Sequence, residues 1–321
     1  MIDQQSPQII TVTLNPAVDS TLYFNDFHVG GLNRVLRETV DPGGKGVNVA
    51  KVVRALGLPV TATGFLGRGN AALFQDFFRQ VDIHDSFIQI AGSTRTNLKL
   101  VDEPTGQVSE VNFAGLPYSE TDLYQLSNTL RSLVYPGCWV VCSGSLPPNA
   151  PTDLYACLIG ELRQKGGKVF LDTSGKALAE GIRAKPDAIK PNLHELGELT
   201  GCHLQNDSEV LAAMEELLNA GIGLVVVSMG AKGALAATRE QRWKVTPPPI
   251  AVKSTVGAGD TLVAGLLVGL VKDLTLADSM RLATAAAAAA VALPGTRAAS
   301  QVEMEKLCKQ VVVEKINFDI K

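Results

Sequence analysis

The residues with the clearest chemical potential stand at Ser254 to Thr261, where the sequence reads STVGAGDT. Gly257 and Gly259 flank Ala258 and let the backbone turn with several N–H groups pointing the same way. The apolar run Leu262 to Val271 predicts a buried helix that begins at this turn. Free N–H groups at the start of a helix, together with the positive end of its dipole, attract anions. This stretch therefore predicts a site for a phosphate group or a developing oxyanion.

Asp260 lies inside this predicted anion site, where a carboxylate would repel a phosphate unless it had a task of its own. The obvious task is that of a general base, which takes a proton from a hydroxyl that attacks a phosphorus atom held beside it. The alternative is that Asp260 only caps a helix and that the glycines only form a tight turn. The local sequence supports both interpretations equally, because glycine and a capping residue are common where helices begin.

The overall composition narrows the class of partner. The 321 residues carry a formal net charge of −3 at pH 7 with mixed signs, which is not the pattern of a protein that binds nucleic acid or an anionic membrane. Five cysteines without CxxC spacing and four scattered histidines indicate neither a disulfide framework nor a zinc site. The partner is therefore expected to be a small molecule.

The sequence predicts neither a membrane span nor a targeting segment. The longest apolar stretches, Leu262 to Val271 and Ala285 to Leu293, are about half the length that spans a bilayer. Met1 to Gln8 lacks the basic start and the apolar core of a signal peptide. A cytoplasmic protein is therefore expected.

The first predicted strand brings a second carboxylate to a position suited to ligand binding. Ile9 to Leu14 is rich in β-branched residues and ends at Asn15-Pro16, which is typical of a buried strand. Asp19 follows the carboxyl end of this strand, where open α/β sheets bind their ligands. Turn chemistry after Asn-Pro explains Asp19 equally well.

Two pairs of alternating segments predict β-hairpins that interrupt the α/β pattern. The first pair is Ser20 to Phe27 and Asn33 to Val40, and the second is Asn97 to Asp102 and Gln107 to Phe113. Together they predict a small extra sheet, formed by about residues 20–41 and 95–114.

The rest of the chain alternates apolar strands with amphipathic helices. The predicted strands are Trp139 to Ser143, Val169 to Asp172, Ala188 to Lys190 and Leu224 to Ser228, and the predicted helices are Thr121 to Val134, Pro151 to Lys165, Leu193 to Thr200 and Ser208 to Ala220. Strands that are apolar throughout and joined by helices imply a mostly parallel, Rossmann-like sheet covered on both faces. No linker divides the chain, so residues 1–321 are expected to form a single three-layer αβα domain with the small β-sheet attached.

Two glycine-rich turns offer competing ligand sites. Pro42 to Gly46 opens a helix predicted over Val47 to Leu56 and allows close ligand approach, but it is not a Walker loop. Asn48 on this helix is by itself typical of a solvent-facing residue. Gly67 to Ala72 loosely follows the dinucleotide fingerprint GxGxxA, although the acidic residue expected about twenty residues later is misplaced. A nicotinamide-dependent dehydrogenase is therefore retained as a remote alternative.

Thr255 to Asp260, followed by a helix of small residues, resembles the signature of the ribokinase-like sugar kinases. The resemblance extends from Thr13 to Arg297 and covers nearly the whole chain. It implies that Asp260 is the catalytic base, that the amides of Gly257, Ala258 and Gly259 hold the transferring phosphoryl group, and that the small sheet is a lid over the sugar.

The resemblance also implies a sugar site and a nucleotide site. The substrate residues that it implies are Asp19, Arg34, Gly43, Gly44, Lys45, Asn48, Arg95 and Ser143. The nucleotide residues that it implies are Lys190, Asn192, Ser228, Gly230, Gly233, Thr255 and Gly259. Arg34 and Arg95 are natural ligands for a phosphate already carried by the sugar, although exposed arginine is also common without such a role.

The motif Asn192-x-x-Glu195 is implied to organise magnesium through its bound waters, next to the phosphates of ATP. A site with few protein ligands and retained waters suits magnesium. Asn at the start of a helix with Glu three residues later is also an ordinary capping box, and the residues themselves leave both interpretations open.

The branch of the family that acts on phosphosugars is indicated by Asn33-Arg34, Thr94-Arg95 and Ser143 to Pro148. The resemblance implies ATP- and magnesium-dependent phosphorylation of a ketohexose monophosphate. Thr94 to Leu100 and Gly43 to Gly46 are most similar to bacterial 1-phosphofructokinases, which makes fructose 1-phosphate the expected substrate.

Several alternatives stay open at this point. Gly295-Thr296-Arg297 also fits the minor type of 6-phosphofructokinase, from which Lys45 departs, and tagatose-6-phosphate kinase is a third candidate. A silent sugar-phosphate-binding regulator is a further alternative. Because Phe24, Phe27 and Phe113 are expected to lie uncovered on the lid, a homodimer formed through the lids is also expected.

Overall fold

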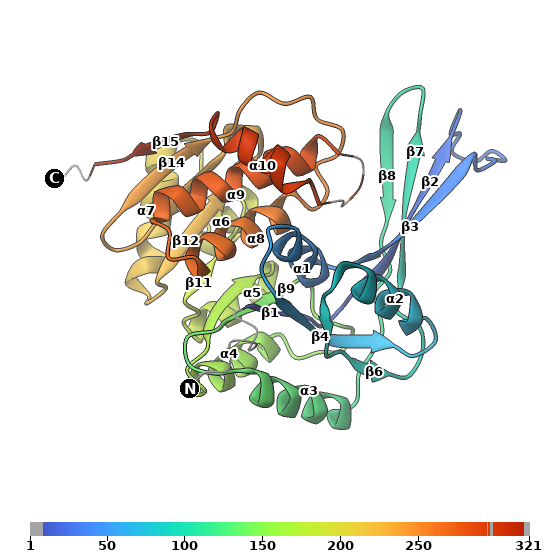
Figure 1. Cartoon of the computed structure of the whole chain (residues 1–321), viewed down its shortest axis with the longest axis horizontal. Helices are drawn as coiled ribbons and strands as arrows, with labels where there is room; N and C mark the ends of the chain where they lie inside the picture. The colour runs from blue at the N-terminus through green and yellow to red at the C-terminus, as the bar shows by residue number, and fades with distance from the viewer. Residues whose placement is uncertain (1–8, 294, 296–297, 318–321) are drawn as a thin grey trace.

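The central sheet determines where the chemistry lies. The computed structural model describes residues 9–293, 295 and 298–317 (Figure 1). The strands of the central sheet are β1 (Ile9–Thr13), β4 (Val60–Gly67), β5 (His84–Asp85), β6 (Ile88–Ile90), β9 (Trp139–Ser143), β10 (Lys168–Asp172), β11 (Ala188–Ile189), β12 (Leu224–Ser228), β13 (Ala234–Ala237), β14 (Arg242–Thr246) and β15 (Val312–Lys315). Their order is β15-β14-β13-β12-β11-β10-β9-β1-β4-β5, and β6 also pairs with β4.

The pairing in this sheet confirms the predicted mostly parallel arrangement. Along the sheet from β5 at one edge to β12, every pair of neighbouring strands is parallel. Beyond β12, the strands β13, β14 and β15 add antiparallel pairs at the other edge. β1 and β9 are buried along their whole lengths, as expected for strands covered on both faces. The carboxyl ends of β1, β9, β10 and β11 therefore meet at the same edge of the sheet.

Ten α-helices in the described part of the chain form the two outer layers. One layer consists of α1 (Lys45–Ala55), α2 (Ala71–Val81), α8 (Ala258–Val271), α9 (Leu276–Val291) and α10 (Gln301–Cys308). The opposite layer consists of α3 (Glu120–Leu133), α4 (Leu154–Gln164), α5 (Gly175–Arg183), α6 (Leu193–Thr200) and α7 (Asp207–Asn219). Each layer has its own apolar core against the sheet, so the predicted three-layer αβα fold is confirmed.

Small residues let α8 lie close to α9. A Cβ added at Gly265 would stand 2.6 Å from Cα of Ala283, and one at Gly269 would stand 2.6 Å from Cβ of Ser279. Ala285 and Ala286 of α9 are fully buried in the same core. This tight packing fixes the axis of α8, and its first turn carries the glycine-rich motif.

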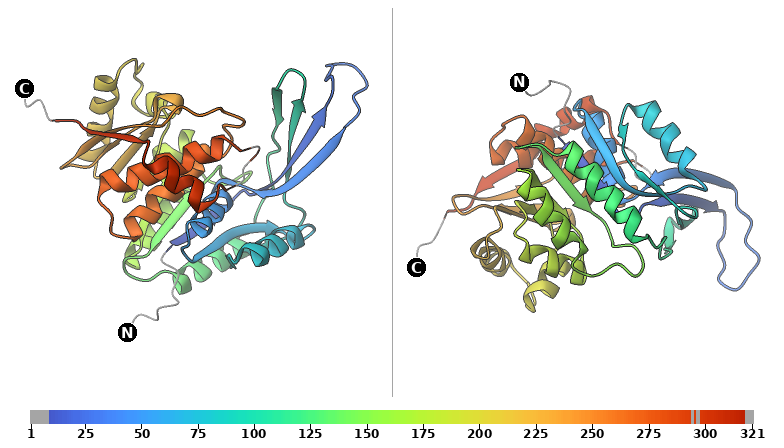
Figure 2. Two further views of the ribbon diagram at one scale, coloured as in Figure 1. Left: turned by 45° about the horizontal axis from the view of Figure 1, so that its top comes forward. Right: turned by 90° about the horizontal axis from the view of Figure 1, so that it is seen from below.

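A second sheet stands away from the body of the molecule, as Figure 2 shows in both views. Its strands are β2 (Ala17–Phe24), β3 (Arg37–Gly43), β7 (Thr96–Asp102) and β8 (Gln107–Val111), in the order β3-β2-β7-β8. Both predicted hairpins are present, and β2 joins them by pairing with β7 in parallel. The prediction that Phe24 is uncovered is wrong, because Phe24 is 5% exposed and its ring lies 5.0 Å from that of Phe27.

Three helices of the structure were not predicted from the sequence. Helix α2 follows the turn at Gly67 to Asn70, and α5 and α10 are the other two. Within the described residues, no helix is both long and apolar enough to cross a membrane. Met1 to Gln8, Thr296 and Arg297, which entered the sequence argument, lie outside the described residues.

Candidate active site

Asp260 and Asn48 bring the starts of two helices together. Gly257 caps α8 in the left-handed region, with φ of 77°, and Asp260 lies in the first turn of that helix. Nδ2 of Asn48 in α1 donates a hydrogen bond of 2.8 Å to Oδ2 of Asp260. Both side chains are buried, so Asn48 does not face solvent as its sequence context alone suggested.

The pKa of Asp260 is raised to about 6, mainly by burial and also by the nearby charge of Asp172. Lys45, the hydrogen bond from Asn48 and Lys190 act in the opposite direction and limit this rise. A carboxylate with this pKa is ionised at neutral pH and is a stronger base than an exposed one. The carboxylate of Asp260 is bonded to Asn48 of another helix and not to a backbone N–H at the start of α8, so the geometry suits proton abstraction better than simple helix capping.

Asp172 is a charged centre that the sequence argument missed. It is the last residue of β10 and is almost fully buried. Its Oδ1 lies 3.4 Å from Nζ of Lys45 and 3.3 Å from Nζ of Lys190. Burial acts to raise the pKa of Asp172, but the two lysines outweigh it and hold that pKa below its ordinary value. A carboxylate at the end of a buried parallel strand was the signal available in the sequence.

Lys190 connects this centre to the glycine-rich turn. A Cβ added at Gly259 would lie 3.4 Å from Nζ of Lys190, so the ammonium group lies beside the backbone of that turn. The pKa of Lys45 is raised, mainly by Asp172, with smaller contributions from Asp260 and Glu195. Two ammonium groups and the amide groups at the start of α8 form an arrangement that can stabilise a phosphoryl group.

The predicted sugar residues meet at the base of the lid. Oδ2 of Asp19 lies 3.3 Å from Nζ of Lys99, and Nδ2 of Asn97 donates to Oδ1 of Asp19 at 3.4 Å. A Cβ at Gly43 would lie 2.7 Å from Oδ2 of Asp19, so only glycine fits there. Gly44 has φ of 112° and caps α1, which begins at Lys45. Lys99 and Asn97 were missed by the sequence argument, because the pairing of β2 with β7 brings them to Asp19.

Ser143 lies deeper than the other predicted sugar residues. It ends β9 in register with Asp172 of β10 and Thr13 of β1. Its hydroxyl oxygen is buried and has no hydrogen-bond partner among the described residues. The structure therefore places Ser143 beneath the site rather than on its surface.

The two predicted phosphate-binding arginines are not brought together. Arg95 donates from Nε to the carbonyl of Pro16 at 3.2 Å, from NH2 to that of Asn15 at 3.0 Å and from NH1 to that of Phe113. These bonds use three of the five N–H groups of its guanidinium and tie the lid to the end of β1. Arg34 is exposed in the loop between β2 and β3, at the end of the lid that Figure 1 shows farthest from the sheet.

The motif predicted to organise magnesium forms the capping box that was its alternative. Oδ1 of Asn192 accepts from the backbone N–H of Glu195, and Oε2 of Glu195 accepts from that of Asn192, both at 2.8 Å. Oε1 of Glu195 forms no hydrogen bond within the described part of the chain, so it is available to a water ligand. No group of three His, Cys, Asp or Glu side chains in that part could hold a metal directly. These residues fit magnesium held by water and phosphate oxygens.

The predicted nucleotide loop follows β12 as a glycine turn. Ser228 forms a bridge with Asn192, which places this loop next to the capping box. Gly230 has φ of 58°, and a Cβ at Gly233 would lie 1.9 Å from the carbonyl oxygen of Val245. Thr255 is exposed ahead of α8. The predicted loop therefore presents the small residues Gly230 and Ala231 at its surface, with Lys232 exposed beside them.

The rival dinucleotide site is closed by the protein itself. A Cβ at Gly67 would lie 2.3 Å from the backbone nitrogen of Thr94, and one at Gly69 would lie 2.3 Å from Oγ of Ser93. The backbone N–H of Gly67 donates to Oγ1 of Thr94 at 2.9 Å. These glycines accommodate a neighbouring loop, so the turn offers no open cradle for a pyrophosphate.

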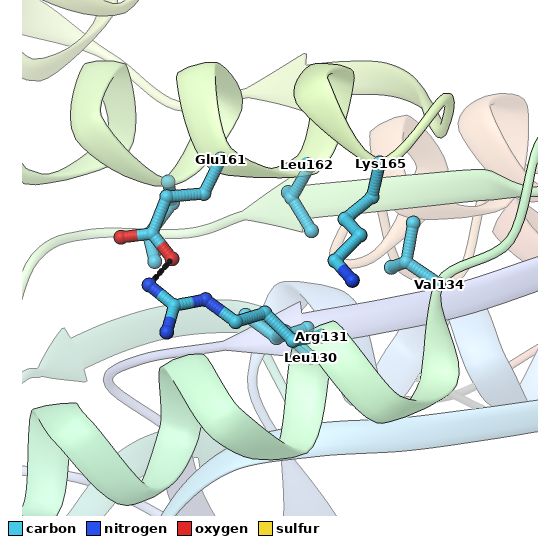
Figure 3. A pocket seen from close by; sticks show the side chains of 7 residues that line it. Leu130, Arg131, Val134, Glu161, Leu162 and Lys165 are labelled. Atoms are coloured by element: carbon cyan, nitrogen blue, oxygen red, sulfur yellow. Dashed lines mark hydrogen bonds and ion pairs between the residues drawn. The ribbon is translucent and has the colours of Figure 1, made fainter.

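The small hollow between α3 and α4 carries no comparable chemistry. Figure 3 shows Arg131 and Glu161 facing each other across it, and their charged groups are 3.0 Å apart. Leu130, Val134 and Leu162 provide apolar walls, and its volume is about 10 Å³. That space holds about one water molecule and no sugar or nucleotide.

Comparison with known proteins agrees with this geometry. Residues 12–303 match the pfkB family of carbohydrate kinases. This match covers most of the chain, and the protein belongs to that family. It is thus a sugar kinase, a phosphotransferase that acts on a carbohydrate.

Individual relatives are similar over nearly the whole chain. The 1-phosphofructokinase of Vibrio cholerae is 41% identical over 95% of this chain and 96% of its own length. The 1-phosphofructokinase of Xanthomonas campestris is 44% identical over 87% of this chain and 90% of its own. The crystal structure of phosphofructokinase-2 from Escherichia coli in complex with potassium has a TM-score of 0.90 at 30% identity, covering 94% of this chain and 98% of that one. Another structure of the same Escherichia coli protein is described as its tetrameric inhibited form.

Proposed function

We propose that the chain transfers the γ-phosphoryl group of ATP to fructose 1-phosphate, giving fructose 1,6-bisphosphate and ADP. The observation that carries the proposal is the buried Asp260 at the start of α8, hydrogen-bonded to Asn48. The relatives named 1-phosphofructokinase, at 41% and 44% identity, support this choice of phosphosugar.

One group of residues serves proton removal, and another serves transfer of the phosphoryl group. Asp260 takes the proton of the C6 hydroxyl, whose oxygen then forms a bond to the γ-phosphorus while the bond to the departing ADP breaks. The amides of Gly257, Ala258 and Gly259, with Lys190, stabilise the transferring group. Magnesium, organised through water by Asn192 and Glu195, would neutralise charge on the phosphates of ATP.

The sugar is proposed to bind between the lid and the start of α1. Asp19, Gly43, Gly44 and Asn48 hold its hydroxyl groups, with Lys45 beside them and Ser143 beneath. Arg95 is assigned to its existing phosphate, whereas the position of Arg34 at the far end of the lid does not support the same role for it. Support for Arg95 comes from the two N–H groups that its three backbone bonds leave available.

The nucleotide is proposed to lie on the loop after β12. Ser228, Gly230 and Gly233 are assigned to its ribose and phosphates, and Thr255 to the phosphate end. Gly230, Ala231 and Gly233 support the assignment, since their small size permits close approach of a flat ligand.

We propose that residues 1–321 act as a single kinase domain, with 20–41 and 95–114 as the lid, and that two copies associate through their lids. Val29 and Leu32 in the loop between β2 and β3 are 94% and 85% exposed, and Phe113 is 53% exposed. Large apolar side chains at such exposure favour a covered interface.

Since the proposed substrates are ATP and a phosphosugar, the proposed compartment is the cytoplasm.

A coupled ADP-release assay tests the proposal on fructose 1-phosphate, fructose 6-phosphate, tagatose 6-phosphate and free fructose. We expect the highest kcat/KM with fructose 1-phosphate, and activity only when both ATP and magnesium are supplied. Equal or higher kcat/KM with fructose 6-phosphate would reassign the substrate, and the similarity to phosphofructokinase-2 makes that comparison the most informative one. Turnover of free fructose alone would remove the phosphate-binding role of Arg95.

A further inference from the structure

Asp172 occupies the junction between the two proposed halves of the site. Lys45 begins α1 and belongs to the sugar side, whereas Lys190 follows β11 and belongs to the nucleotide side. Both ammonium groups approach the same carboxylate oxygen, Oδ1 of Asp172, at 3.4 Å and 3.3 Å. This single atom thus links the two sides through their lysines.

The burial of Asp172 separates its task from that of Asp260. Its side chain has no exposed area, and its Oδ2 has no hydrogen-bond partner among the described residues. A group in this position cannot reach a substrate. It can act only through the side chains it holds: Nζ of Lys190 lies beside the turn at Gly259, and the charge of Lys45 acts on Asp260.

We infer that Asp172 is a positioning residue for phosphoryl transfer, which holds the Lys45 and Lys190 ammonium groups in place at the glycine-rich turn. The inference rests on the proposed kinase function and adds to it a residue that does not touch substrate.

Electrostatics explains why one carboxylate is needed at this place. Both ammonium groups lie within 3.4 Å of the same oxygen atom and therefore repel each other, and the charge of Asp172 offsets this repulsion in a poorly hydrated region. Without it, the lysines would turn away from each other and from the incoming phosphoryl group. Misplacement of a catalytic group by about 1 Å costs about 10²-fold in rate.

The same charge acts on the proposed base. The charged side chains that influence the site are Asp172 from β10, Lys45 and Lys51 from α1, Lys190 after β11, and Glu195 from α6. Asp172 is the negative group among them that opposes ionisation of Asp260 most directly. When Asp172 is neutralised, two ammonium groups stay and one carboxylate is lost, so Asp260 should ionise at lower pH.

The variant Asp172→Asn tests the inference with the phosphosugar that the wild-type protein uses best. We expect kcat to fall about 10²-fold and the acid limb of the kcat/KM profile to move to lower pH. The matched control is Asp187→Asn, a carboxylate at the opposite end of the same strands, whose Oδ2 accepts from the N–H of Val169 at 2.8 Å. We expect this control to keep the wild-type kcat and pH profile. A kcat and acid limb unchanged in Asp172→Asn would overturn the inference.

A second variant covers the case in which Asp172→Asn does not fold. Lys45→Met removes a cation from the same centre, so the inference expects a lower kcat and an acid limb at higher pH, opposite in direction to that of Asp172→Asn. An unshifted limb in Lys45→Met would contradict the inference.

The inference and the proposed function fail in distinguishable ways. Inactivity of the wild-type protein on every phosphosugar would remove the proposed function alone. In that case, an NMR titration of the Asp260 carboxyl in the wild type and in each folded variant still decides whether Asp172 and Lys45 set its pKa in opposite directions.

Discussion

Nδ2 of Asn48 donates a 2.8 Å hydrogen bond to Oδ2 of Asp260, although the two residues are 212 positions apart in the chain. This bond holds one carboxylate oxygen and leaves the other for a substrate hydroxyl. It also favours the ionised form of Asp260, against the effect of burial. One buried amide therefore both orients the proposed base and keeps it charged near neutral pH.

The first prediction concerns turnover in Asp260→Asn. The variant keeps the shape of the side chain but cannot accept the hydroxyl proton, so kcat should fall 10²–10⁴-fold, about 3–5 kcal/mol of barrier. ATP binding should be retained, as measured by calorimetry. Turnover above about a tenth of the wild-type value would show that Asp260 is not the base.

The second prediction concerns the pH dependence of stability. The folded protein holds the pKa of Asp260 at about 6, above the ordinary 3.8, so between these values the folded chain binds more protons than the unfolded chain. The contribution of Asp260 to stability is therefore present below pH 4 and is lost as pH rises through 6. Relative to the wild type, Asp260→Asn should therefore gain about 2 kcal/mol more free energy of unfolding at pH 7.5 than at pH 4. Denaturant titrations of both proteins at both pH values measure this, and an equal difference at the two pH values would contradict it.

The third prediction separates capping from magnesium binding at Glu195. Glutamine also completes a capping box, so Glu195→Gln should retain stability while raising the magnesium concentration needed for half-maximal activity. The matched control is Glu303→Gln, because Glu303 forms the same kind of box with Ser300 at the start of α10. An unchanged magnesium titration in Glu195→Gln would leave only the capping role.

The fourth prediction concerns Arg95. Loss of a charge-assisted bond to the sugar phosphate should cost about 1.5–3 kcal/mol, so Arg95→Ala should raise KM for fructose 1-phosphate roughly ten- to 150-fold with little change for ATP. Arg37→Ala is the control, because Arg37 is a lid arginine paired with Glu103 at 2.7 Å. A lower melting temperature of Arg95→Ala with unchanged KM would mean that Arg95 only ties the lid to β1.

The fifth prediction concerns assembly. Light scattering at micromolar concentration should give at least twice the chain mass of 33.9 kDa. The double variant Val29→Asp, Leu32→Asp places charges on the exposed loop of the lid and should lower the mass of the assembly. A monomeric mass for the wild-type protein would remove the idea of a lid interface.

The fold was largely predictable because its strands are apolar throughout and are separated by clear helical patterns. Helix α5 was missed because it is short, begins at Gly175 and contains Gly181, which weakens the helical signal. Phe24 was predicted to be uncovered because its alternating strand suggested one open face, yet Phe27 covers it.

The site was less predictable where it depends on contacts between distant strands. Asp260 and Asn48 stand in glycine-rich motifs, so the sequence draws attention to them. Lys99 reaches Asp19 only because β2 pairs with β7, a register that no local pattern reveals. Asp172 closes an ordinary apolar strand, and its importance emerges only when Lys45 and Lys190 are seen to converge on it.

Gly44 alone connects the lid strand β3 to helix α1, and the proposed sugar site lies on both sides of this connection. β3 ends at Gly43 and α1 begins at Lys45, and a Cβ at Gly44 would stand 2.9 Å from Cγ2 of Thr13. Gly43 therefore belongs to the lid, whereas Lys45 and Asn48 belong to the helix layer on the central sheet. A sugar that touches both sides would connect the two parts, so we expect substrate binding to immobilise the lid as well.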